Sequence, residues 1–386
     1  MEHLLNSTVK QIEISGIRKF FNMVSDKKNI LSLTIGQPDF ATPEHIKYAA
    51  KQAIDNNYTT YTHNAGLLSL RQAIAHAVST DYQLNYDPAN EIIVTVGASQ
   101  AIDIALRTII EPGDEVLLPG PVYPGYEPLI RLSGAKPVYI DTTDSDFKIT
   151  PEKLKQHITS KTKCLILPYP SNPTGVTLTK NELKDIADII EGKNIFIIAD
   201  EIYSKLTYDT THYSIAGINE QIRQQTIVIN GLSKSHAMTG WRIGYILAPS
   251  WLTKHMLKVH QYNVSCATSV SQHAALAAIK NGVQDPTAMK HSYQKRRDYV
   301  YTRLIDMGLN VVKPDGAFYF FLKTNSNLPS FDIALNLVNE VGLALVPGSA
   351  FSQYGEGYLR LSYAYHLETL EEGLKRLETY LRQYNK

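Results

Sequence analysis

Cysteine is scarce in this 386-residue chain: only Cys164 and Cys266 occur, far apart and without the spacing of metal ligands. Both lie in apolar stretches, so we expect buried, unreactive thiols in a reducing compartment. This pattern speaks against a disulfide framework. It also gives no reason to expect a bound metal.

Long hydrophobic runs are lacking as well. No stretch reaches the roughly eighteen apolar residues of a membrane-spanning helix. Residues Met1 to Ser15 alternate polar and apolar side chains and contain no apolar signal-peptide core. The sequence therefore predicts a cytoplasmic protein that does not engage a membrane.

An excess of charge of one sign is the third absence, since 38 basic and 37 acidic residues give a formal net charge of +1. These charges are scattered without a basic stripe, so nucleic acid is not expected as a partner. The hydrophobic content of 44% is ordinary for a globular protein. A chain of this length favours two domains over one small core.

Between about residues 45 and 280, short apolar runs alternate with helical patterns such as Ser99 to Ile110 and Lys180 to Ile190. The runs are rich in β-branched residues and almost continuously apolar, which is typical of strands buried on both faces. The alternation predicts a large α/β domain, residues 46–284, with a doubly wound, mainly parallel sheet. The expected strands are Ile92 to Val96, Glu115 to Leu118, Pro137 to Ile140, Cys164 to Leu167, Ile195 to Ala199, Thr226 to Ile229 and Ile243 to Ala248.

Strands and helices no longer alternate strictly after this region, so residues 285–386 are predicted to form a small C-terminal α+β domain. Residues 1–45 form an N-terminal segment with one short helical stretch, and the sequence leaves open on which domain it packs. The other expected elements are helices over Tyr293 to Met307, near Asp332 to Glu340 and from about Glu368, strands at Val311-Val312, Phe318 to Phe321 and Tyr358 to Ser362, and an apolar run from Val341 to Val346.

The most informative segment is Asn230 to Tyr245, in which Lys234 follows an expected buried strand and the small residues Gly231 and Ser233. An amine in an apolar site has its ammonium form disfavoured, so it is available as a nucleophile. Arg242 begins the next apolar run and would supply a fixed cation for a phosphate or carboxylate. An isolated lysine is usually a solvated surface charge, but this flanking pattern favours a functional site.

This segment resembles the cofactor-lysine signature of the fold-type I, class I and II pyridoxal-phosphate aminotransferases, and other motifs of that family occur in the right order. The resemblance covers nearly the whole chain and implies a fold-type I architecture with a seven-stranded sheet. Within the family the chain resembles the bacterial aminotransferase A group, which is assigned to N-acetyl-L,L-diaminopimelate transamination in lysine synthesis. The further matching segments are Gly36 to Phe40, Tyr61-Thr62 with Gly66, Asn172-Pro173-Thr174-Gly175, Asp200-Glu201-Ile202-Tyr203 and Tyr358 to Ser362.

The resemblance implies pyridoxal 5′-phosphate as cofactor, carried covalently by Lys234, which would then move a proton between the substrate and the cofactor. Asp200 would face the pyridine nitrogen and keep it protonated. Asn172 and Tyr203 would hydrogen-bond the ring's 3′ oxygen. Each has a plainer alternative: Asp200 as a helix cap, Asn172 as a turn residue and Tyr203 as a core aromatic.

The phosphate is expected at the turn containing Ala98 and Ser99, where free amides and the start of a helix favour an anion. Ser99 could instead only cap the helix, and the two roles are compatible. Ser233 and Arg242 would complete the phosphate site. Gly231 stands where some relatives have a serine, so one phosphate-binding hydroxyl is absent.

Three further residues take their expected roles from the resemblance. Tyr123 would stack on the cofactor ring, although it could simply be a packing residue. Tyr61 would reach the phosphate in a neighbouring subunit, which implies a homodimer with shared active sites. Arg360 would bind the substrate α-carboxylate, aided by the Gly36 backbone and Asn172. An arginine on a strand could otherwise be a surface charge.

No motif fixes the substrate side chain. Glutamate and 2-oxoglutarate are the expected shared pair. Arg18 is a candidate for binding a distal carboxylate if its segment folds over the site, although a solvated helix charge is the simpler interpretation. His63 and Asn64 are weaker candidates for the entrance.

Other functions remain as alternatives. A β-lyase would use the same cofactor, and transfer of an amino group to 2-oxoglutarate rather than release of pyruvate and ammonia distinguishes the two reactions. A ligand-sensing module is less favoured, because only about 30 residues precede Gly36 and an added DNA-binding domain needs more. A Rossmann dehydrogenase is not favoured, because no Gly-x-Gly-x-x-Gly motif follows the first expected strand.

Overall fold

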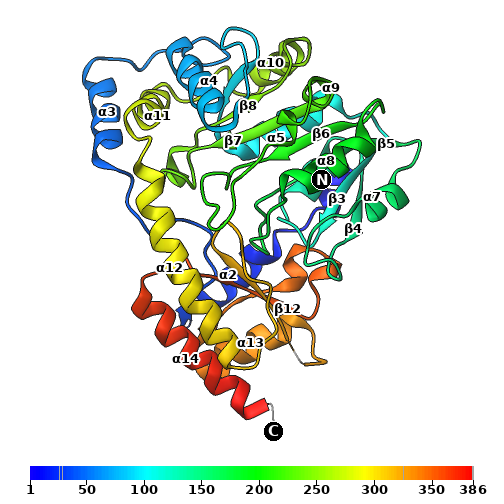
Figure 1. Ribbon diagram of the computed structural model, residues 1–386, viewed down its shortest axis with the longest axis vertical. Coiled ribbons are helices and arrows are strands. Elements are labelled where there is room, and N and C mark those ends of the chain that lie inside the picture. The colour runs from blue at the N-terminus through cyan, green and yellow to red at the C-terminus, as the bar shows by residue number, and fades with distance from the viewer. Residues whose placement is uncertain (26, 28, 325, 385–386) are drawn as a thin grey trace.

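The computed structural model describes residues 1–25, 27, 29–324 and 326–384, and its larger part is built around a seven-stranded sheet (Figure 1). The strand order is β2-β8-β7-β6-β5-β3-β4. All neighbouring strands are parallel except β8, which is antiparallel to both β2 and β7. The strands are β2 (Ile92–Thr95), β3 (Glu115–Gly120), β4 (Lys136–Asp141), β5 (Thr162–Leu167), β6 (Phe196–Asp200), β7 (Thr226–Gly231) and β8 (Gly244–Leu247).

All seven strands expected from the apolar runs are therefore confirmed, with bounds shifted by a few residues at most. Successive residues of one strand belong to different apolar clusters, as Val116 and Leu117 of β3 show. Side chains alternate between the two faces of a strand, so a strand that is covered on both faces needs apolar residues at every position.

Helices cover both faces of this sheet. The face that contains Ile93 and Val116 packs against buried residues of α5, α6 and α10, and the opposite face packs against α4, α7, α8 and α11. The helices expected over Ser99 to Ile110 and Lys180 to Ile190 are confirmed as α5 and α8. The helices of this part are α3 (Glu44–Asp55), α4 (Leu68–Tyr82), α5 (Gly97–Ile109), α6 (Tyr126–Leu132), α7 (Pro151–His157), α8 (Lys180–Ile190), α9 (Glu220–Gln225), α10 (Ser250–Val264) and α11 (Ser269–Asn281).

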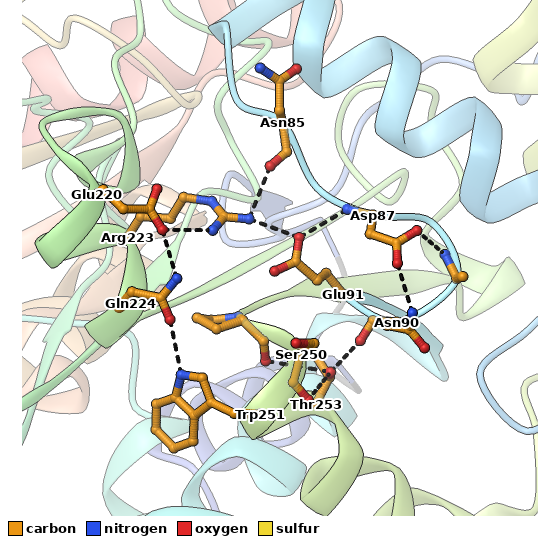
Figure 2. A network of polar contacts seen from close by, with 12 residues as sticks. Asn85, Asp87, Asn90, Glu91, Glu220, Arg223, Gln224, Ser250, Trp251 and Thr253 are labelled. Atoms are coloured by element: carbon orange, nitrogen blue, oxygen red, sulfur yellow. Dashed lines mark hydrogen bonds and ion pairs between the residues drawn. The ribbon is translucent and has the colours of Figure 1, made fainter.

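A polar network ties the edge of the sheet to α9 and α10 (Figure 2). Arg223 of α9 donates to Glu91, just before β2, at 2.8 Å, and to the Asn85 carbonyl at 3.0 Å. The Trp251 indole of α10 donates to Gln224 at 3.0 Å. Arg223 and Glu91 are both largely buried, so this pair is screened less than a surface ion pair. The network holds the entry to β2 in place.

The second part of the chain contains a three-stranded antiparallel sheet of order β11-β12-β9. The expected helices near 293–307, 332–340 and from 368 are confirmed, as are the strands near 318–321 and at 358–362. The elements are α12 (Asp285–Asp306), β9 (Tyr319–Lys323), α13 (Ser330–Val341), β10 (Leu343–Ala344), β11 (Val346–Pro347), β12 (Tyr358–Ser362) and α14 (Leu367–Tyr384).

The strand expected at Val311-Val312 is wrong, because these residues form no strand. Val311 is buried in the cluster that also contains Phe318 and Leu361, and Val312 packs against the neighbouring cluster. Apolar packing alone therefore accounts for the two valines. A pair of β-branched residues carries no information on whether a partner strand lies beside it.

The N-terminal segment contacts both parts of the molecule. Strand β1 (Leu31–Ser32) pairs in parallel with β10, and α2 (Gly16–Ser25) packs against β11. Helix α1 (Ser7–Gln11) contacts α6 beside the large sheet. The division of the chain after residues 45 and 284 stays a prediction.

The two cysteines are both free thiols, but only one is fully buried. Cys164 of β5 is buried, as expected, whereas Cys266 is only partly buried, so the expectation is wrong for that residue. Cys266 follows α10 in a bend, where the apolar flanks do not enclose it. Within the described residues, no helix combines the length and the apolar character needed to cross a bilayer.

Candidate active site

A cavity of about 400 Å³ lies where the parallel strands of the large sheet end. Asp200 is the last residue of β6, and Ser233 and Lys234 lie two and three positions after the end of β7. The opposite wall comes from the second part of the chain, through Tyr319 of β9 and Arg360 of β12. Clefts at the carboxyl ends of strands are the usual ligand sites of open α/β sheets.

Lys234 places its amine in this cavity. Its Nζ donates to the Gly36 carbonyl at 2.6 Å and lies 5.8 Å from the centre of the Tyr203 ring. Burial lowers the pKa of Lys234 to about 8, and the Arg360 and Arg242 guanidinium groups lower it further than Asp200 raises it. About a tenth of this amine is therefore unprotonated at pH 7, far more than for a lysine of ordinary pKa.

Asp200 is buried and both of its carboxylate oxygens accept hydrogen bonds. Tyr126 Oη donates to Oδ2 at 2.7 Å, and the Ile202 amide donates to Oδ1 at 3.2 Å. Burial raises the pKa of Asp200 to about 6, and these two hydrogen bonds oppose the rise. These hydrogen bonds hold the carboxylate in one orientation, and a nearby cation would stabilise its ionised form.

Arg360 is only 2% exposed although it carries a charge. It donates to Asn172 Oδ1 at 2.8 Å and to the Thr34 carbonyl at 2.6 Å, and its guanidinium lies over the Tyr319 ring at 4.4 Å. Its Nε–H has no hydrogen-bond partner among the described residues. Among the described residues no carboxylate pairs with this guanidinium, so an incoming anion would be strongly favoured.

An anion site forms where β2 turns into α5. Arg242 lies against Gly97, and a Cβ on that glycine would come within 2.5 Å of Arg242 Nη2. Gly97 has a φ of +75°, a conformation that glycine adopts without strain. Ala98 and Ser99, at the start of α5, line the same cavity together with Ser233 and Arg242. Free amides, a helix start and a guanidinium are the groups that bind phosphate.

Tyr203 meets a residue that the sequence did not single out. Its hydroxyl shares a hydrogen bond of 2.8 Å with the Tyr319 hydroxyl. Tyr319 also lies against Gly36, where any Cβ would collide with the Tyr319 hydroxyl. Gly36 therefore allows the N-terminal segment to approach the cavity closely.

Eleven of the expected site residues thus line one cavity, and they come from every part of the chain. They are Gly36, Ala98, Ser99, Tyr123, Asn172, Asp200, Tyr203, Ser233, Lys234, Arg242 and Arg360.

The remaining candidates lie outside this lining. Tyr61 is 86% exposed, which is compatible with a contact to another subunit. Arg18 and His63 are also exposed and line no part of the cavity, whereas Ile17, the neighbour of Arg18, does. Asn64 donates instead to the Ser265 carbonyl at 2.7 Å.

Known proteins are similar to this chain over nearly its whole length. A family model described as aminotransferase class I and II matches residues 28–377. The chain belongs to this family. It is therefore an aminotransferase, a transferase enzyme of a family that generally depends on pyridoxal phosphate.

Several relatives of this aminotransferase are similar over nearly their full length. A probable N-acetyl-LL-diaminopimelate aminotransferase of Bacillus subtilis is 60% identical, over 99% of this chain and 96% of that protein. The aromatic-amino-acid aminotransferase 2 of Thermococcus litoralis is 40% identical, with 98% of each chain covered. The solved aspartate aminotransferase of Thermus thermophilus with maleate has a TM-score of 0.92 at 33% identity, covering 97% of this chain and 99% of that one.

The aminotransferase contains two site residues that the sequence could not reveal. Tyr126 and Tyr319 are two of 24 tyrosines and belong to no distinctive motif. A hint exists only for Tyr126, which lies three positions after Tyr123 at the start of α6. Their importance follows from their contacts with Asp200 and Tyr203.

The cavity also has the features that pyridoxal phosphate requires. It offers an amine of lowered pKa, a buried carboxylate for the ring nitrogen, and an anion site where Gly97 leaves room for Arg242. A volume of about 400 Å³ suits a cofactor of this size. The residues present therefore fit this cofactor.

Proposed function

We propose that this aminotransferase uses pyridoxal 5′-phosphate bound covalently to Lys234 and moves an amino group between an amino acid and a 2-oxo acid. The single observation that carries the proposal is the common cavity of Lys234, Asp200 and Arg360. Amino transfer needs three different groups, and this cavity offers each of them. Lys234, with a pKa of about 8, supplies the amine for the cofactor, and the buried Asp200 supplies a carboxylate for the ring nitrogen. The buried Arg360 guanidinium, which has no carboxylate partner among the described residues, is available for the substrate α-carboxylate.

Bound pyridoxal phosphate supplies an aldehyde that amines attack and a ring that accepts electrons. Lys234 would hold the cofactor through its amine. When free, the Lys234 amine would act as the general base and acid that moves the proton of the substrate Cα. Asp200 would stabilise the protonated ring nitrogen, and Tyr126 keeps that carboxylate in place.

Orientation comes from the groups around the ring. Tyr203 and Asn172 would donate to the ring's 3′ oxygen, and Tyr123 would pack against the ring face. Ser233, Arg242 and the amides of Ala98 and Ser99 would hold the phosphate. Arg360 would bind the α-carboxylate, with Asn172 and the Gly36 backbone beside it. These contacts would orient the substrate for reaction.

The substrate proposal is more specific. Glutamate and 2-oxoglutarate serve as one pair, and N-acetyl-LL-diaminopimelate is the second amino acid. The similarity of 60% identity to the probable N-acetyl-LL-diaminopimelate aminotransferase of Bacillus subtilis supports this choice. We also propose a homodimer in which Tyr61 reaches the phosphate of the neighbouring site, supported by its exposure of 86%.

An absorbance titration of the loaded protein tests the reaction. Each amino donor should remove the visible band of the bound cofactor, and 2-oxoglutarate should restore it with formation of glutamate. Release of pyruvate and ammonia without glutamate would indicate a β-lyase instead.

Borohydride trapping tests the attachment. Reduction of the loaded protein followed by peptide mass spectrometry should find the cofactor on Lys234. A label absent from Lys234, or present on another lysine, would overturn the proposal.

A further inference from the structure

A second cavity, of about 610 Å³, adjoins the active-site cavity, and we call it the outer cavity. Ser99, Ile102 and Tyr123 line both spaces, so the two share one wall. The other walls of the outer cavity come from three segments: the N-terminal residues 11–16 with Lys19, residues 124–131 around α6, and Phe331, Pro347, Ser349 and Ala350 beyond them. Space therefore continues beyond the part of the active-site cavity that Ser99, Ile102 and Tyr123 line.

The N-terminal wall of the outer cavity is fixed by packing. Phe20 meets Phe331 edge to face, with ring centres 6.1 Å apart. Gly16 approaches Ala350 so closely that a Cβ would lie 3.0 Å from the Ala350 Cβ. Helix α1 contacts α6 on the other side. The segment thus spans the outer cavity between the two parts of the molecule.

Two ion pairs lie in the lining of the outer cavity and differ in how firmly they are held. Arg131 pairs with Glu127 at 2.7 Å, and the other Glu127 oxygen accepts from Tyr139 at 2.6 Å. Lys19 pairs with Glu13 at 2.6 Å, but the two side chains are 48% and 80% exposed. Exposed pairs of this kind add little stability, so Glu13 can give way to another carboxylate at small cost.

We propose that the outer cavity binds the far end of a long amino acid substrate that carries a second carboxylate and a blocked amino group, with Lys19 binding that carboxylate. This inference rests on the proposed function, because the reacting end must lie at Lys234 and Arg360. The chemistry of the lining supports a branched far end. Phe331, Pro347, Ala350 and Ile12 offer apolar contacts for an acyl group, and Lys19 offers the cation.

Lys19 is distinguished from its neighbour Arg18 by position. Both cations lie in the first turns of α2, but side chains one residue apart point about 100° away from each other around a helix. Ile17 lines the active-site cavity and Lys19 lines the outer cavity, whereas Arg18 is exposed and lines neither. The sequence-based candidate for the distal carboxylate is thereby replaced by the next residue.

Two substrates that differ only in the distal carboxylate test the assignment. N-acetyl-LL-diaminopimelate and Nε-acetyl-L-lysine share the chain and the acetamido group, and only the first carries the second carboxylate. We expect the wild-type enzyme to prefer the first substrate in kcat/KM. Lys19→Met should reduce this preference about tenfold, the size expected for a lost charge-assisted hydrogen bond.

Arg18→Met is the matched control, because it removes a cation of the same helix that faces solvent. It should leave the preference within about twofold of wild type, and both variants should keep the wild-type rate with glutamate and 2-oxoglutarate. An unchanged preference in Lys19→Met, or an equal loss in Arg18→Met, overturns the inference.

The test also separates this inference from the proposed function. If glutamate reacts but N-acetyl-LL-diaminopimelate does not, the outer-cavity assignment fails while amino transfer stands. If no amino acid removes the visible band of the bound cofactor, the proposed function itself fails.

Discussion

At the scale of single residues, the active-site cavity shifts the pKa values of Lys234 and Asp200 in opposite directions. Burial lowers the pKa of Lys234 and two nearby guanidinium groups lower it further, whereas burial raises the pKa of Asp200 to about 6. Such perturbed groups in one cleft are typical of active sites. The smaller contributions of single neighbours to both pKa values can be removed one at a time.

The pKa of Lys234 can be read from its reactivity. In the cofactor-free protein, the rate of Lys234 acetylation by acetic anhydride should rise with a midpoint near pH 8 and level off about one pH unit higher, because only the neutral amine reacts. Arg360→Met should move this midpoint upward, since removal of a nearby cation favours the ammonium form. Peptide mass spectrometry across pH measures it, with exposed Lys254 as internal reference. A midpoint two pH units higher in the wild type would contradict the assignment of the shift.

Tyr126 should act as a positioning residue for Asp200. Tyr126→Phe removes the hydrogen bond to Oδ2, so the pKa of Asp200 should rise above about 6 and less carboxylate is present near that pH. We expect roughly fivefold weaker cofactor binding at pH 6.5 and a smaller loss at pH 8.5, where the carboxyl ionises again.

Fluorescence titration with pyridoxal phosphate at both pH values measures this difference. Tyr139→Phe is the control, because that hydroxyl donates to Glu127 instead of Asp200. A loss of the same size at every pH would show that Tyr126 does not act through ionisation of Asp200.

At the scale of elements, the turn between β2 and α5 forms the anion site because Gly97 has no side chain. Gly97→Ala would add a Cβ both at positive φ and against Arg242. We expect at least about tenfold weaker binding of pyridoxal phosphate, together with a loss of about 1 kcal/mol in the free energy of unfolding.

Gly113→Ala separates the two effects. Gly113 also has positive φ, at +96°, but a Cβ there would meet nothing within 4 Å. Urea denaturation should show a similar loss of stability, with unchanged cofactor affinity. If both variants bind the cofactor equally well, crowding of Arg242 is not what matters at Gly97.

Elements of the large sheet were predictable because their signal is local. The runs from Ile92 to Ala248 are apolar at successive positions, and burial on both faces requires that pattern. At Val311-Val312 the same residue types form no strand. Two residues are too few to show the alternation of a strand, and strand pairing depends on whether a partner strand lies beside them.

At the scale of the whole molecule, the active-site cavity joins both parts of the chain. Arg360 and Asn172, 188 residues apart, meet at 2.8 Å. Tyr61 alone among the expected cofactor ligands lies outside the lining and is exposed. This position is the basis for the proposed homodimer.

Mixed dimers test whether Tyr61 acts on a neighbouring site. Lys234→Ala and Tyr61→Ala should each reduce activity at least about tenfold as pure proteins, because each lacks a group that binds the cofactor. Refolding an equal mixture should restore activity, since one site of each hybrid then has both Lys234 and a Tyr61 from its partner. A mixture no more active than the Tyr61→Ala protein would place Tyr61 in its own subunit's site or remove it from the mechanism.

The sequence by itself determined the alternation of strands and helices, the family, and the lysine, aspartate and arginine at the centre of the cavity, because each is carried by a short pattern of neighbouring residues. Only the tertiary structure decided that Tyr126 supports Asp200, that Tyr319 meets Tyr203, and that Lys19 rather than Arg18 lines the outer cavity. These relations join segments that are distant along the chain or depend on the rotation of a helix about its axis. Both the contacts between distant segments and the rotation of the helix are determined by the packing of the whole chain, so no local sequence pattern predicts them.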